Sequence, residues 1–186
     1  KSTDNPIQRV KAPIDHPNPY NPKHGFIASA NNKPFAKTSI PFSFSFATSD
    51  RVNRMKQMMQ QQNKVDFEFL KKVQQDVFNQ NALDIVKQVQ DSLSGTGFSP
   101  LAQWSGEFAA NQKEPLLFYS LGRQLWESHV QGLDVVPPKV REEMLAAPHW
   151  KDELLRILRT KDNHWVAKQV EEAWSITEEL LEDYPT

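Results

Sequence analysis

The stretch DRVNRMKQMMQQ, residues 50–61, shows the periodicity that decides the fold class of this chain. Its apolar residues recur at helical spacing and fall on one side of a helix: Val52, Met55, Met58 and Met59. Thr48, Ser49 and Asp50 are candidate N-caps. The stretch therefore predicts a helix from about Asp50 to Gln61, with its methionines filling a core.

Helical spacing continues through the rest of the chain. Asp66 can cap a second helix with apolar residues as far as Val77, and a third helix is predicted from Ala82 to Leu93. Further amphipathic stretches predict helices over residues 115–130, 139–145, 150–158 and 166–181, with Pro137, Pro138 and Pro148 between them. We expect residues 48–186 to form a helical region with at least five helices.

The first 47 residues have a different character, because seven of the 13 prolines fall within the first 41 residues. Proline fixes its own backbone and pushes the preceding residue towards extended conformations. We predict an extended segment with at most short strands, at Gly25–Ala30 and at Ser39–Ala47. The second of these alternates serine with apolar residues, which would place three rings on one side: Phe42, Phe44 and Phe46. The expected fold class is mainly α, a multi-helix region preceded by an extended, Pro-rich segment.

Composition excludes several classes of partner. The 22 Lys and Arg nearly balance the 23 Asp and Glu, and the formal net charge of −1 gives no general attraction to nucleic acid or to an anionic membrane. There is no cysteine for a disulfide framework or a thiolate metal site. No stretch approaches the roughly 18 apolar residues that span a bilayer. We therefore expect neither nucleic acid nor a membrane as a partner.

Taken residue by residue, the chain carries no common catalytic motif, neither a His-Glu-x-x-His sequence, nor a Gly-rich phosphate loop, nor Gly-x-Ser-x-Gly. The five histidines lie too far apart to predict a metal site: His16, His24, His129, His149 and His164. Three glutamate pairs fall on polar helix faces and are expected to be solvated: Glu142–Glu143, Glu171–Glu172 and Glu178–Glu179. On these grounds alone, Asn31-Asn32 would be a turn or loop pair and Arg51 a surface residue in the first turn of a helix.

One region stands apart, GFIASANNKP at residues 25–34, preceded by Asn21-Pro22 and followed by Asp50-Arg51 and Arg54. Here the chain resembles the penicillin acylase (penicillin amidase) family of N-terminal-nucleophile hydrolases, whose catalytic subunit contains a stretch of this form. The resemblance is specific from Asn21 to about Val89. It continues more faintly in two elements, Trp104-Ser105-Gly106 and Ala173-Trp174 with Leu180. It implies a part of a larger αββα enzyme, with residues 1–47 in the catalytic core.

The resemblance also implies roles for two residues. Family members attack an amide with an N-terminal Ser whose own α-amino group is the base, and the resulting oxyanion needs preorganised donors. The first Asn of the family's pair supplies one donor, which assigns an oxyanion-hole role to Asn31. The family's Arg near the site corresponds to Arg51, with a role in organising the pocket. We expect the Asn31 carboxamide to have no partner within this chain, since its donor is meant for the oxyanion.

The expected partners also follow from the resemblance. Lys1 stands first and Ser2 has no free amine, so we expect this chain to be inactive alone. Its expected partner is the remainder of the parent enzyme, which comprises the segment that bears the nucleophile and an alpha subunit. The expected substrate is an acylated small-molecule amide, such as a β-lactam side chain or an acyl-homoserine lactone.

No cofactor or metal is predicted in this chain. Residues 35–47 hold no Asp where some family members place a calcium ligand, although calcium is possible in the full-length parent. The family resemblance implies a periplasmic or secreted location. A stand-alone helical interaction module without catalysis is the alternative function.

Overall fold

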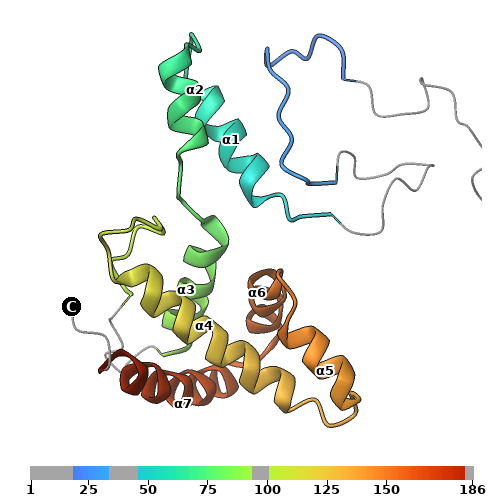
Figure 1. Cartoon of the computed structure of the whole chain (residues 1–186), viewed down its shortest axis with the longest axis vertical. Coiled ribbons are helices and arrows are strands. Elements are labelled where there is room, and N and C mark those ends of the chain that lie inside the picture. Colours follow the sequence, from blue (N-terminus) through green and yellow to red (C-terminus); the bar gives the residue numbers. More distant parts are fainter. Residues whose placement is uncertain (1–18, 34–45, 94–100, 183–186) are drawn as a thin grey trace, which may run out of the picture. The chain divides into compact units, whose positions relative to one another are not determined.

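A computed structural model describes residues 19–33, 46–93 and 101–182 of the chain. It divides into two compact units, Lys1–Val73 and Gln74–Thr186. The described residues contain seven α-helices and no strand, so the predicted mainly α fold is confirmed (Figure 1). The first unit contains residues 19–33, which form neither helix nor strand, helix α1 (Asp50–Gln60) and all but the last residue of α2 (Phe67–Gln74).

The second unit is a bundle of five helices: α3 (Gln80–Ser92), α4 (Glu114–Gln131), α5 (Pro138–Leu145), α6 (Trp150–Thr160) and α7 (Asn163–Glu182). The long helices α4 and α7 lie side by side (Figure 1), and α7 also contacts α3. Helix α6 packs against α3 and α4, while α5 packs against α4. Sequence periodicity predicted each of these helices to within a few residues of its ends.

Polar side chains cap several helices, and one of these caps, Asp66, was predicted from the sequence. The cap expected for α1 is not observed, because the side chain of its N-cap residue, Ser49, makes no capping hydrogen bond. The carboxylate of Asp66 accepts the backbone N–H of Phe69 at 2.8 Å, and Asp162 accepts the N–H of Trp165 at 2.9 Å. This hydrogen bond lowers the pKa of Asp162. Asn79 caps α3 in the same way, through the N–H of Ala82 at 3.0 Å. Each cap satisfies an N–H group that the first turn of a helix cannot pair internally.

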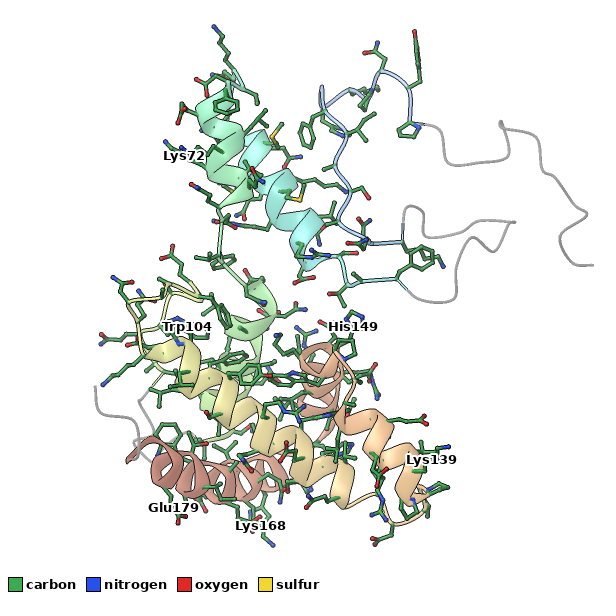
Figure 2. All side chains as sticks on the ribbon, viewed as in Figure 1. Lys72, Trp104, Lys139, His149, Lys168 and Glu179 are labelled. Carbon is green, nitrogen blue, oxygen red and sulfur yellow. The ribbon has the colours of Figure 1, made fainter. Side chains whose placement is uncertain are left out.

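One apolar core holds the second unit together, with contributions from α3, α4, α6 and α7. At one end of α4, Phe118 is 1% exposed and lies 5.2 Å from Trp104 and 5.8 Å from Phe108, measured between ring centroids. Figure 2 shows Trp104 in the connection that leads into α4. Along the same helix, Gly122 allows the close approach of α6, because a Cβ atom there would lie 2.8 Å from the Trp150 ring.

The first unit buries far less apolar surface. Among its described residues, Val52 is the one buried large apolar side chain, and α2 contains no buried residue. Several apolar side chains are instead exposed, and the largest exposed fractions are those of Tyr20 (92%), Phe67 (77%) and Ile27 (65%). The first unit is also basic, with 12 Lys and Arg against 5 Asp and Glu, whereas the second has 10 against 18.

Two expectations about local structure are wrong, and a third falls partly on residues that the structure does not describe. The short strand expected at Gly25–Ala30 does not form, and this segment is extended without strand pairing. Helix α2 ends at Gln74, so Val77 lies beyond it. In the predicted second strand, Phe42 and Phe44 fall outside the described residues, while Phe46 is half-buried and Ala47 makes an isolated bridge with Asn32.

No helix in the described part of the chain is both long enough and apolar enough to cross a bilayer.

His129 is expected to make the stability of the second unit depend on pH. The imidazole lies near the end of α4, 6.2 Å from the rings of both Trp126 and Trp165. Burial lowers its pKa below the ordinary 6.5, and the positive charges of Lys161 and Arg156 lower it further. The folded state therefore favours neutral His129, so the free energy of unfolding should fall as the pH drops below about 6.5.

We expect His129→Gln to reduce this acid-side loss of stability. The check is the urea midpoint of the second unit's unfolding between about pH 5 and pH 8, where histidine titrates. His164→Gln, which removes an exposed imidazole from α7 of the same unit, is the control. An unchanged pH profile in His129→Gln would assign the effect to other groups.

Candidate functional site

The segment that carries the Asn pair begins with a tight turn. The backbone N–H of Gly25 donates to the carbonyl of Pro22 at 2.8 Å, and Gly25 has a φ of 77°, which suits glycine because it has no Cβ. The chain then runs extended to a second special position at Asn31, whose φ is 60°. Asparagine is one of the few residues that adopts this left-handed geometry readily. The turn expected from the Asn pair is therefore present.

Backbone pairing brings the start of α1 to this turn. The N–H of Ala47 donates to the carbonyl of Asn31 at 2.8 Å, and Ala47 forms a parallel bridge with Asn32. Three residues later α1 begins, where the hydroxyl of Thr48 donates to the carboxylate of Asp50 at 2.6 Å. Arg51, the second residue of α1, is thereby held within reach of the Asn pair.

The Arg51 side chain makes the contact that defines the site. Its Nη2 atom donates to two acceptors, the carbonyl oxygen of Ala30 and the Oδ1 atom of Asn31, each at 3.0 Å. Arginine has no acceptor, so the Asn31 atom facing it must be the carboxamide oxygen and not the nitrogen. Both hydrogens of Nη2 are therefore used to hold Asn31 and its preceding peptide.

This geometry corrects the expectation that the Asn31 carboxamide has no partner within the chain. Its oxygen is bound by a guanidinium, whereas its Nδ2 atom has no acceptor among the residues that the structure describes. Asn31 and Arg51 are both exposed. The carboxamide thus presents two N–H donors at the surface while its opposite end is fixed.

The second Asn of the pair has a different arrangement. Its Oδ1 atom accepts the backbone N–H of Ala30 at 3.1 Å, and its Nδ2 atom donates to the carbonyl of Lys33 at 3.0 Å. Asn32 is half-buried. Both ends of its carboxamide are engaged with neighbouring backbone, so it offers no free group to a ligand in the way that Asn31 does.

The Trp104-Ser105-Gly106 element is part of the second unit's framework. The indole N–H of Trp104 donates to the carbonyl of Glu107 at 3.0 Å, and the carbonyl of Gly106 accepts the N–H of Asn79 at 2.9 Å. Gly106 has a φ of 82° and lies directly against Leu83. These contacts fix the connection before α4 against the start of α3.

The other titratable residues do not assemble into a site. Among the described residues, no three His, Asp or Glu side chains gather as metal ligands. Glu142, Glu143, Glu171, Glu172 and Glu179 are exposed on their helices. Of the histidines, His24 contacts the ring of Phe26 in the first unit, whereas His129, His149 and His164 lie in the second.

Comparison with known families identifies the family of this chain. The family model described as penicillin amidase matches residues 2–183, which is nearly the whole chain. The chain belongs to the penicillin amidase family. No curated protein and no solved structure gives a significant match. Penicillin amidases hydrolyse amides, and the Asn-Asn motif, Arg51 and both helical units lie within the matched residues.

Asn32 and Ala47 contribute to the site although neither was singled out from the sequence for it. The left-handed turn at Asn31 could be anticipated from the Asn pair, and such a turn often uses the side chain of a neighbouring Asn. The pairing of Ala47 with this turn joins residues distant in sequence and left no periodic signal. The penicillin amidase match covers both residues without distinguishing them.

Proposed function

We propose that this chain supplies an oxyanion-hole donor, together with its support, to an amide hydrolase of the penicillin amidase type. The observation that carries the proposal is the Arg51–Asn31 hydrogen bond, which binds the carboxamide oxygen and leaves the Nδ2 donors unpaired among the described residues. A donor of this kind is useful where negative charge develops during the reaction. The tetrahedral oxyanion formed from an attacked amide is such a charge.

The guanidinium of Arg51 improves Asn31 as a donor in two ways. It fixes the orientation of the carboxamide before substrate binds, so that no reorganisation is needed as the oxyanion forms. It also withdraws electron density through a charge-assisted hydrogen bond to Oδ1, which polarises the N–H groups at the other end. A neutral amide contacts the oxyanion, while the positive charge stays behind it.

We propose that the nucleophile and the remaining donors come from other parts of the enzyme, in line with the family resemblance. The exposed positions of Asn31 and Arg51 support this, because an oxyanion hole works best when water is excluded. The exposed apolar side chains of the first unit, Phe67 and Ile27 among them, offer surface for such a covering part. The proposed substrate is an acylated small-molecule amide, such as a β-lactam side chain or an acyl-homoserine lactone.

The same apolar exposure favours a second candidate, a helical interaction module without catalysis. The two proposals differ at Asn31 and Arg51. An interaction module gives no reason for an arginine to hold the oxygen of an exposed carboxamide and leave its donors unpaired. Amide hydrolysis by the protein that contains this chain, dependent on these two residues, therefore separates the candidates.

Arg51→Ala should lower kcat of the processed enzyme by about tenfold, and by at most about 10²-fold, because a misplaced donor loses part of its stabilisation of the transition state. The measurement is steady-state hydrolysis of an acylated amide, after the cleaved subunits have been verified. Lys56→Ala removes a positive charge from the same helix and is the control. Equal activity in Arg51→Ala and Lys56→Ala would contradict the proposed role of Arg51.

A further inference from the structure

The turn at Asn31 is held by more than Arg51. The N–H of Ala30 donates to the side chain of Asn32, its carbonyl accepts from Arg51, and the carbonyl of Asn31 accepts from Ala47. The polar backbone groups on both sides of the Asn31 Cα are thus fixed by three different partners. Of these partners, the Asn32 carboxamide is the closest in sequence. Its hydrogen bond to Ala30 bridges across Asn31, the residue with left-handed backbone geometry.

The Asn32 side chain closes a small ring around Asn31. Its oxygen reaches back two residues to the Ala30 N–H at 3.1 Å, and its nitrogen reaches forward to the Lys33 carbonyl at 3.0 Å. Because Asn31 has a φ of 60°, its backbone is in a region that an unsupported chain leaves readily. The ring resists rotation of the two peptide groups that set the direction of the Asn31 Cα–Cβ bond.

We infer that Asn32 is a positioning residue, which holds the backbone turn that aims the Asn31 carboxamide. The inference rests on the proposed function of Asn31 as an oxyanion donor. Asn32 has both ends of its own carboxamide bound to backbone, so it acts through Asn31 and does not contact the reacting atoms. Arg51 fixes the side chain of Asn31, and Asn32 fixes the backbone that carries it.

The test is a double-mutant cycle in the processed enzyme that contains this chain. Asn32→Ala should lower kcat about tenfold and leave KM nearly unchanged, because a misdirected donor weakens transition-state binding more than substrate binding. In an Asn31→Ala background the same substitution should have almost no further effect on kcat, since the donor that it positions is gone. Independent, multiplicative losses would overturn the inference.

A second pair of variants keeps the test decisive if Asn32→Ala is poorly processed. Asn32→Asp retains an oxygen for the Ala30 N–H, whereas Asn32→Leu has a similar size and no polar atom. The aspartate variant should recover part of the kcat that the leucine variant loses. Equal kcat in the two variants would show that the hydrogen bond does not matter.

The cycle also separates this inference from the proposed function. If Asn31→Ala alone keeps near-normal kcat, Asn31 is not the oxyanion donor, and both proposals fail. If Asn31→Ala is strongly impaired but Asn32→Ala retains the parent kcat, the proposed function stands and the positioning role of Asn32 fails. Circular dichroism of each variant verifies that the helical content is that of the parent.

Discussion

Replacing Asn31 by alanine is expected to reduce turnover of the processed enzyme by roughly two to three orders of magnitude, the effect of losing one preorganised oxyanion donor. Both kcat and kcat/KM should fall, because the lost hydrogen bond is strongest in the transition state. The fold should change little. Asn31 is exposed and lies outside the helices, so the backbone strain of an alanine at its φ of 60° should stay local to the turn.

The measurement is single-substrate kinetics on an acylated amide, after the cleaved subunits have been identified, since autoproteolysis could use the same donor. Asn53→Ala is the matched control, because it removes an exposed carboxamide from α1 of the same unit. Near-normal turnover in a correctly processed Asn31→Ala enzyme would show that Asn31 is a turn residue and not an oxyanion donor.

Replacing Phe118 by alanine should destabilise the second unit by about 3–5 kcal/mol, the usual effect of removing a buried ring. Phe118 is 1% exposed and packs against the rings of Trp104 and Phe108. A loss of this size is a large part of the roughly 5–15 kcal/mol that stabilises an ordinary domain. Part of the protein should therefore be unfolded at moderate temperature.

Urea denaturation followed by circular dichroism measures this change, provided that the free energy of unfolding falls with urea concentration at the same slope in the variant and the parent. Leu116→Ala is the control on the same helix, because Leu116 is 46% exposed, and its free energy of unfolding should change by about 0.5 kcal/mol or less. Similar midpoints for the two variants would mean that the Trp104–Phe108–Phe118 cluster contributes little to stability.

The helices were predictable because their signals are local. In α6, for example, apolar residues repeat along one face, and Trp150, Leu154 and Leu158 are indeed buried. A cap such as Asp66 binds a backbone N–H only three residues away, so a short window of sequence contains both the capping residue and its partner. The strand at Gly25–Ala30 was wrongly predicted because a strand depends on a partner, and two apolar residues in an extended segment do not specify one.

The site was only partly predictable, for a related reason. Family resemblance pointed to Asn31 and Arg51 separately, but their hydrogen bond joins residues 20 positions apart and depends on where Ala47 pairs. The pairing of Ala47 fixes the start of α1 relative to the turn at Asn31, and no periodic pattern in the sequence predicts it. Asn32 could have been considered from the turn alone, because an Asn side chain commonly binds backbone two residues away.

The confinement of tryptophan to one unit gives the protein an intrinsic fluorescence probe for that unit. All five tryptophans lie between residues 74 and 186: Trp104, Trp126, Trp150, Trp165 and Trp174. Intrinsic fluorescence should therefore report the unfolding of the five-helix bundle alone, whereas circular dichroism also includes α1 and α2. The separation between the two unfolding curves would measure how far the unit that carries Asn31 and Arg51 depends on the other unit for its folding.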